Sequence, residues 1–452
     1  MLLMLAGLVC QVVWPSVVNA QRDTVDGWIE SYMHDNHVPG LALGIVRAGR
    51  LVRAQGYGLA NLELRVPVTP STVFESASLG KQFTAAGILL LVQDGRLGLD
   101  DPITRYLSRA PERWRSITIR HLLTHTSGLP DYEAADSTLN LRLDYSEEEL
   151  LRRFVRFPLL FEPGEEYSYS NTGYALLGMI IRRATGKHWD HLLRQRIFEP
   201  LGMTTARMIT YDEVVPNRAD GYRVDDGVIR NRVTVGPGWN TTADGSLLLS
   251  VRDLAAWDAG LLRHLLLHDT LQQAMWSPVR LKDGSHTSYG FGWNLIDLPG
   301  RRAVEHSGAG WGFKTYIGRF LDDSLTVIVL ANSESLDPEA VGHAVAGLVA
   351  PRLAFRPRVP MRLPNAALAE YAGAYRLPTG EFINVRPRGT GLDFFLEDVL
   401  LGHGEPEVRD RFFSVDGPEA VAIFARDSNG VIQWLMAKRY QSSPERARRV
   451  RE

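Results

Sequence analysis

The sequence contains a single cysteine, Cys10, among 452 residues. One thiol excludes an internal disulfide and a cysteine-based zinc site. The net charge of −2 gives no electrostatic reason to expect nucleic acid as a partner. The sequence also lacks a phosphate-binding loop, a dinucleotide fingerprint, a GxSxG elbow and an HExxH zinc motif. We therefore expect no cofactor and no metal, and the oligomeric state stays open.

Two histidines, His121 and His125, are spaced four apart, as zinc ligands on a helix would be. The intervening residues Leu-Leu-Thr supply no glutamate base. We therefore expect these histidines to form structural hydrogen bonds.

The first twenty residues, MLLMLAGLVCQVVWPSVVNA, are mostly apolar and end in Val18-Asn19-Ala20. Small residues at the two positions that a signal peptidase recognises predict a cleaved signal peptide over residues 1–20. The chain would then be exported, to the periplasm or the extracellular space. No lysine or arginine precedes the apolar run, so an N-terminal membrane anchor or a buried first strand are the alternatives.

Beyond the leader, residues 21–350 read as one domain of mixed α/β (α+β) class. Residues 23–37 predict a helix, and the runs 41–46 and 51–56 predict a β-hairpin. Residues 79–93 are apolar on nearly all sides, which predicts a buried helix. Residues 288–331 return to β character, beginning with YGFGW at 289–293. Early strands, a long helical middle and late strands predict one sheet built from both ends of the domain, with a large helical insertion.

Residues 361–452 predict a small, mostly β domain, joined by a linker over 351–364. Alternating apolar runs are separated by turn residues, and Asn429-Gly430 between two such runs is a strong hairpin signal. The basic stretch 446–451 reads as a frayed, solvated tail.

The strongest candidate site is Ser78-Leu79-Gly80-Lys81, at the start of the apolar helix. Positions i and i+3 share a helix face, so the hydroxyl and the amine can touch. A serine hydroxyl needs a neighbour that takes its proton, and lysine serves if burial lowers its pKa. The chain has five lysines against 45 arginines, and only Lys81 has a serine three residues before it. Because arginine does not deprotonate, this lysine indicates proton transfer more than charge.

Two further elements could complete the site. Tyr169-Ser170-Asn171 offers a phenol near Lys81 and an amide for a substrate carbonyl, although Ser and Asn are also common helix caps. The segment His306-Ser307-Gly308-Ala309-Gly310 leads into a predicted strand at 313–320, where small residues let a substrate backbone approach. The N–H groups of Ala309 and Ser78 would form an oxyanion hole. A simple Gly-rich turn is the alternative.

Together, these three elements resemble the serine β-lactamase and penicillin-binding protein superfamily, in particular its class C β-lactamase-like branch of D-peptidases and esterases. Stretches that match are LLTHTSGL at 122–129, Glu162-Pro-Gly164, YGFGW at 289–293 and LAAW at 254–257. The resemblance covers about residues 22–350. It implies an antiparallel sheet flanked by helices.

The resemblance also implies an acyl-enzyme on the nucleophile Ser78, with Lys81 and Tyr169 sharing the role of base. Asn171 would bind substrate, as would His306, Ser307, Gly308 and Ala309 along the third strand. Dedicated β-lactamases usually carry lysine where this chain has His306, which favours D-amino-acid peptides, amides or short acyl esters as substrates. A β-lactamase and a non-catalytic penicillin-binding or sensor protein remain the alternatives. The implied partner is a small molecule or peptide.

Overall fold

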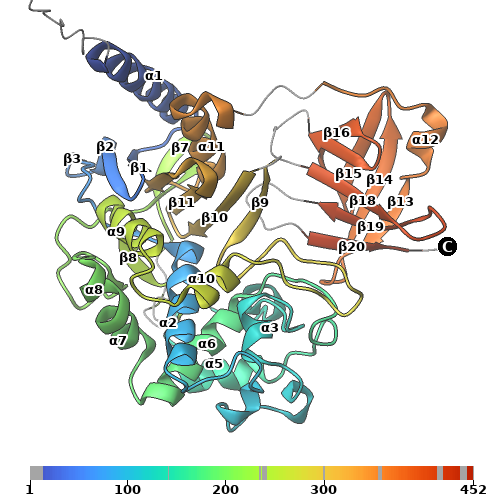
Figure 1. Cartoon of the computed structure of the whole chain (residues 1–452), viewed down its shortest axis with the longest axis horizontal. Coiled ribbons are helices and arrows are strands. Elements are labelled where there is room, and N and C mark those ends of the chain that lie inside the picture. The colour runs from blue at the N-terminus through green and yellow to red at the C-terminus, as the bar shows by residue number, and fades with distance from the viewer. Residues whose placement is uncertain are drawn as a thin grey trace, which may run out of the picture.

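A computed structural model describes residues 14–140, 142–233, 236, 242–298, 301–354, 359–414, 421–437 and 445–450. It shows a large α/β body and a separate β-barrel at the C-terminal end (Figure 1). No helix among the described residues is long and apolar enough to cross a membrane. The first helix, α1 (Trp14–Asp35), begins inside the predicted leader and thus earlier than expected.

The central sheet is antiparallel and has seven strands in the order β3-β2-β1-β12-β11-β10-β9. Its strands come from both ends of the body, as the sequence predicted. Leu41 of β1, the first strand along the chain, pairs with Ala331 of β12, the last strand of this sheet along the chain. The strands are β1 (Gly40–Arg47), β2 (Arg50–Asn61), β3 (Val66–Pro67), β9 (Asn294–Leu298), β10 (Arg301–Gly310), β11 (Phe313–Phe320) and β12 (Leu325–Ala331).

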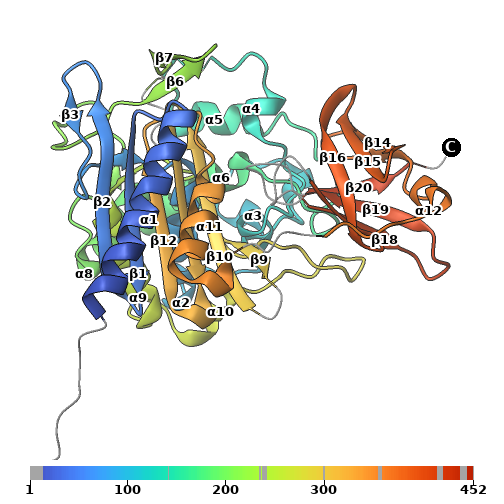
Figure 2. The same cartoon turned by 90° about the horizontal axis from the view of Figure 1, so that it is seen from above.

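Helices cover both faces of this sheet (Figure 2). Along β1, Leu41, Leu43 and Ile45 pack against α1 and α11 (Pro338–Val349), whereas Ala42 and Val46 belong to the opposite core. This alternation follows from the period of two in a strand. Burying both faces fixes the register of the sheet, since a slip of one residue would exchange them.

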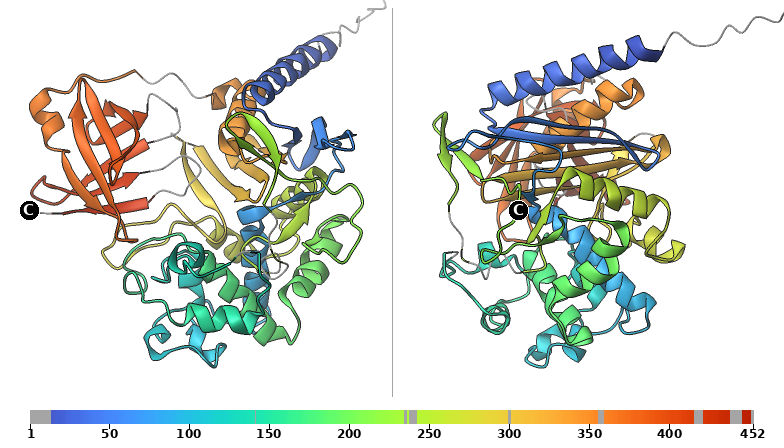
Figure 3. Two further views of the ribbon diagram at one scale, coloured as in Figure 1. Left: turned by 180° about the vertical axis from the view of Figure 1, so that it is seen from behind. Right: turned by 90° about the vertical axis from the view of Figure 1, so that its left-hand side faces the viewer.

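The opposite core contains the helical region that the sequence predicted between the early and late strands (Figure 3). At its centre is α2 (Lys81–Gln93), which is buried on nearly all sides as its apolar sequence indicated. Ser146 and Glu149 form the expected capping box. The other helices are α3 (Ile119–Leu123), α4 (Tyr132–Ala135), α5 (Glu147–Phe154), α6 (Asn171–Thr185), α7 (Trp189–Leu193), α8 (Glu199–Leu201), α9 (Val251–Leu262) and α10 (Asp269–Met275).

Two small sheets complete this body. A three-stranded sheet has the order β4-β8-β5 and lies beside the start of α2, and a two-stranded ribbon pairs β6 with β7. Their bounds are β4 (Phe74–Glu75), β5 (Arg207–Met208), β6 (Tyr222–Asp225), β7 (Val228–Asn231) and β8 (Leu247–Leu249).

The C-terminal strands close into an eight-stranded antiparallel barrel with its own core. The Asn429-Gly430 turn joins β18 and β19 as predicted. The strands are β13 (Gly373–Arg376), β14 (Phe382–Arg388), β15 (Gly391–Leu396), β16 (Val399–Val408), β17 (Arg411–Ser414), β18 (Val421–Arg426), β19 (Ile432–Ala437) and β20 (Glu445–Arg449), with the short helix α12 (Asn365–Ala369) before them.

Three local predictions were wrong. The supposed tail at 446–451 contains most of β20, which closes the barrel and buries Ala447 completely. The YGFGW segment at 289–293 is a loop before β9. The small residues 306–310 lead into the predicted strand at 313–320, which is β11, but they form the end of β10 and not the start of a strand. In each case tertiary pairing decided the local structure, which sequence patterns do not contain.

Candidate active site

Ser78 lies on a short 3-10 turn, Ala77–Gly80, directly before α2. It is therefore not on the α-helix itself, although the spacing to Lys81 still brings the two side chains together. Two hydrogen bonds hold the turn at Ser76, whose hydroxyl donates to the Gly245 carbonyl at 2.8 Å and whose carbonyl accepts from Thr315 at 2.7 Å. Ala77 has a φ of 47°, a left-handed conformation that is costly for a residue with a Cβ. The surrounding contacts thus impose a fixed position on Ser78.

Lys81 is fully buried, and its Nζ has three oxygen neighbours. These are Ser78 Oγ at 3.0 Å, Asn171 Oδ1 at 2.7 Å and the Asp244 carbonyl at 2.6 Å. Burial lowers the pKa of Lys81 to about 8, and the carboxylates of Asp244, Asp131 and Glu133 oppose that fall. At pH 7, a pKa of about 8 leaves roughly a tenth of the lysine uncharged.

The neighbours of Lys81 also orient its neutral form. An uncharged amine has two N–H donors and one lone pair, and carbonyl oxygens can only accept hydrogen bonds. Asn171 Oδ1 and the Asp244 carbonyl therefore take the two N–H groups. The lone pair is left for the Ser78 hydroxyl, which is the orientation that a general base requires.

Tyr169 lies against this pair. The Lys81 amine is 5.0 Å from the centre of its ring, and the His125 ring lies against it at a tilt of 32°, with 4.2 Å between the ring centres. Burial raises the pKa of Tyr169, and its approach to Ser78 lowers it in part. Its buried hydroxyl makes no hydrogen bond of ordinary geometry among the described residues. The phenol therefore stays protonated near neutral pH and can donate a proton, whereas Lys81 is the better base.

Asn171 begins α6, and its backbone N–H donates to Asp131 at 2.8 Å. The side chain of Asp244 accepts from the Tyr132 hydroxyl at 2.7 Å. Glu133 lines the same pocket as Tyr132 and Asp244, and part of its surface is exposed. The pKa of Glu133 is raised to about 7, mainly by loss of solvent and secondly by repulsion from the Asp131 and Asp244 carboxylates. The site thus places acidic groups around Lys81.

The four candidates on β10 point in different directions, as alternation along a strand requires. His306 is 2% exposed, and its Nε2 is 2.9 Å from the Tyr289 hydroxyl. Ser307 donates to Glu339 of α11 at 2.8 Å, on the far side of the sheet. Gly308 packs on the Ser78 turn, where a Cβ would lie 2.3 Å from the Ser76 carbonyl. Of the four, only Ala309 lines the pocket.

His306 is held as a neutral imidazole. Burial is the main cause that lowers the pKa of His306 to about 3, and the nearby charge of Lys81 is the second. Its Nδ1 lies 2.6 Å from the Ser307 carbonyl, which can only accept, so this nitrogen carries the proton. The other nitrogen then accepts from Tyr289. A buried neutral ring is poorly suited to anchor a substrate carboxylate.

An open pocket of about 100 Å³ leads to Ser78. Ser78, Asn171 and Ala309 from the predicted set line it. The other lining residues are Glu75, Ala77, Tyr132, Glu133, Ile209, Asp244, Gly245, Ser246, Gly310 and Trp311.

Sequence reasoning missed the acidic residues Glu133 and Asp244 and the aromatic residue Tyr289. Glu133 follows the LLTHTSGL stretch by four positions, a signal too weak to single it out. Asp244 lies in an irregular segment, and its carbonyl reaches Lys81 only through tertiary folding. Tyr289 belongs to the matched YGFGW stretch, so its role could have been suspected.

The geometry agrees with comparisons to known proteins. The β-lactamase family profile matches residues 25–350. The chain belongs to the β-lactamase family. It is 32% identical to penicillin-binding protein 4* of Bacillus subtilis (strain 168), over 81% of this chain and 85% of that protein. It is 31% identical to a D-aminopeptidase of Gluconobacter oxydans (strain 621H), over 80% of this chain and 68% of that protein.

Among solved structures, D-amino acid amidase from Ochrobactrum anthropi SV3, complexed with L-phenylalanine amide, has a TM-score of 0.63 and 28% identity. The match covers 73% of this chain and 97% of that one. The β-lactamase fold and its relatives thus identify the chain as a serine hydrolase.

Proposed function

We propose that this β-lactamase-family hydrolase cleaves amide or ester bonds at the carbonyl of D-amino acids with a free α-amino group, through an acyl-enzyme on Ser78. The observation that carries the mechanism is the buried Lys81 amine, 3.0 Å from Ser78 Oγ and with its pKa lowered to about 8. Relatives named D-aminopeptidase and D-amino acid amidase support the substrate class.

In the acylation step, neutral Lys81 takes the Ser78 proton while Ser78 Oγ forms a bond to the substrate carbonyl carbon. The carbonyl oxygen becomes an oxyanion, which the N–H groups of Ser78 and Ala309 would stabilise. Collapse breaks the bond to the leaving amine or alcohol. Tyr169, which burial keeps protonated, would donate a proton to that leaving group and be reprotonated by Lys81. Water then attacks the ester, with the same residues acting in reverse.

The acidic side chains that line the pocket favour binding of the amino end of a substrate over binding of its carboxyl end. Glu133 and Asp244 both line the pocket beside Ser78, and Asp131 stands behind Asn171. Glu133 keeps exposed surface, so a substrate ammonium can reach it. The neutral His306 offers no opposing positive charge. A free α-ammonium next to the scissile carbonyl therefore fits this pocket better than a terminal carboxylate.

The substrate test compares D- and L-alanine p-nitroanilide with p-nitrophenyl acetate, which has no amine. We expect kcat/KM to favour the D-isomer at least about tenfold, as one well-placed contact allows. E133Q should raise KM for the D-anilide by about tenfold, the worth of one charged hydrogen bond, and leave the acetate unaffected. E112Q, a change at a side chain that is 84% exposed, is the matched control.

The nucleophile is tested separately with a fluorophosphonate, followed by mapping of the adduct. Labelling should fall on Ser78 and disappear in S78A. Equal rates for both isomers would reject the substrate class alone, while labelling in S78A would reject the mechanism. Rapid hydrolysis of nitrocefin with slow anilide turnover would favour a β-lactamase instead.

We also propose export, on the apolar composition of residues 1–20 and the Val18-Asn19-Ala20 ending. N-terminal sequencing of the protein from its own cells tests this. A mature chain that begins at Gln21 is the expected result, and a chain that retains residues 1–20 would indicate an anchor or an uncleaved segment.

A further inference from the structure

The barrel contacts the hydrolase body at a loop that continues along the chain to the active site. Arg446 of β20 donates to Asp283 Oδ2 at 2.8 Å and to Ser285 Oγ at 2.7 Å. Its guanidinium lies 3.7 Å from the centre of the Trp434 ring on the neighbouring strand, and its side chain is only 15% exposed. The strand thus presents a held, partly desolvated charge to the body. Asp283 keeps 41% of its side chain exposed, so the contact is defined by the geometry of the guanidinium on two acceptors and on Trp434 more than by the strength of the ion pair.

The loop that Arg446 holds, residues 281–293, continues to the catalytic pair. Tyr289 on this loop bonds to His306 and lies 6.3 Å, edge to face, from Tyr169. Gly292 follows, and a Cβ there would lie 2.9 Å from the Lys81 carbonyl oxygen. The loop therefore packs on the backbone of Lys81 as well as on the ring of Tyr169.

A second loop, residues 162–170, meets the first at the same place. The Lys282 N–H donates to the Gly164 carbonyl at 2.9 Å, next to Asp283. Glu166 lies on this loop, three residues before Tyr169. Desolvation raises the pKa of Glu166, and the positive charges of Arg446 and Arg448 lower it, which places both arginines near its carboxyl group. One strand of the barrel thus faces both loops where they join.

We propose that Arg446 is a positioning residue, which fastens loops 281–293 and 162–170 to the barrel and so fixes Tyr169 and Tyr289 relative to Lys81. Arg446 touches no substrate and takes no part in proton transfer. Its effect passes through Asp283 and Ser285 along the loop backbone. The inference rests on the hydrolase activity and not on the configuration of the substrate, so p-nitrophenyl acetate is the probe.

The test replaces Arg446 by methionine, which keeps the stem over Trp434 and removes the charge. We expect kcat to fall about tenfold, less than the roughly 100-fold that a 1 Å misplacement of catalytic groups can cost, with KM within about twofold. D283N should have a similar effect. If the two residues act as one contact, kcat of the double variant R446M/D283N should fall no further than kcat of either single variant. R446K, which keeps a charge that can reach Asp283, should recover part of the loss.

The matched control is R409M, which removes one arginine charge from the barrel at a side chain that is 66% exposed and paired with Glu370. Its kcat should equal that of the unchanged protein. Melting temperatures of all variants are measured in parallel. The proposal is overturned if kcat of R446M stays within twofold of the unchanged protein, if R409M loses as much, or if the losses of R446M and D283N multiply in the double variant. Loss of D-isomer preference alone would bear only on the proposed function.

Discussion

At the scale of single residues, the proposed catalysis depends on the charge of Lys81. Because the base must be neutral, and its pKa is lowered to about 8, activity should rise with pH up to that value. Below it, kcat/KM should fall about tenfold per pH unit, since the neutral fraction falls in that proportion. An ester without an amino group is the right substrate, because Glu133, with a pKa raised to about 7, would otherwise add its own titration.

The pH profile has a direct control in K81R. Arginine keeps the positive charge but does not deprotonate, so we expect a loss of kcat of about 10²- to 10⁴-fold, the usual contribution of a general base. The limb near pH 8 should vanish from what activity remains. A profile that is flat between pH 6 and 9, or a K81R variant with ordinary activity, would show that Lys81 supplies only charge.

At the scale of elements, the close approach of β10 to the Ser78 turn would shape the proposed oxyanion hole. A Cβ at Gly308 would lie 2.3 Å from the Ser76 carbonyl and 3.1 Å from the Leu79 nitrogen, both backbone atoms that cannot turn aside. G308A should therefore push the strand from the turn, with a cost in stability of about 1–3 kcal/mol, as for other overpacked sites. We expect kcat to fall by more than about tenfold, because the Ala309 and Ser78 N–H groups would separate.

The glycine at position 27 provides the comparison for G308A. It lies in α1, and a Cβ there meets nothing within 4 Å. G27A should leave activity unchanged and keep or slightly raise stability, since alanine favours a helix over glycine. Thermal unfolding and ester hydrolysis, measured on both variants, show whether the added Cβ lowers stability and kcat at position 308 but not at position 27. If G308A retains full activity, the spacing of strand and turn does not control the oxyanion pocket.

The helices and strands also show which parts of the fold the sequence could predict. Periodicity and turn chemistry located β1, β2, α2 and the Asn429-Gly430 hairpin, because these depend on neighbours in the chain. The Ser78–Lys81 spacing correctly predicted contact between the two side chains, even though Ser78 lies on a 3-10 turn. The Asp244 carbonyl and the Arg446 contact could not be foreseen. Each joins segments more than 160 positions apart, and only the folded chain brings them together.

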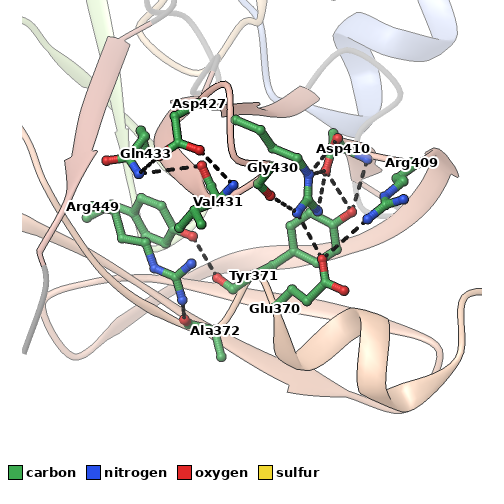
Figure 4. A network of polar contacts seen from close by, with 12 residues as sticks. Glu370, Tyr371, Ala372, Arg409, Asp410, Asp427, Gly430, Val431, Gln433 and Arg449 are labelled. Carbon is green, nitrogen blue, oxygen red and sulfur yellow. Dashed lines mark hydrogen bonds and ion pairs between the residues drawn. The ribbon is translucent and has the colours of Figure 1, made fainter.

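At the scale of the whole molecule, the barrel has an apolar core separate from the cores of the hydrolase body, which predicts two separable stabilities. The barrel has its own apolar cluster and a polar network that includes Glu370, directly after α12, together with Asp410 and Gly430 (Figure 4). Arg426 pairs with Asp410 at 2.8 Å and with Glu370 at 2.9 Å, and it donates to the Gly430 carbonyl at 2.8 Å. The network lies in the barrel and makes none of the contacts that surround Ser78.

R426M should therefore destabilise the barrel by about 1–3 kcal/mol, because Asp410 and Glu370 lose a charged partner. In calorimetry, we expect the barrel transition to move to a lower temperature while that of the hydrolase body stays in place. Between the two transitions, fluorophosphonate should still label Ser78, since Ser78, Lys81 and Tyr169 all belong to the body. Turnover of the ester should fall there to the level of R446M, because an unfolded barrel no longer holds Asp283. A single transition that carries labelling and turnover together would mean that body and barrel fold as one unit, and that the barrel supports the nucleophile itself.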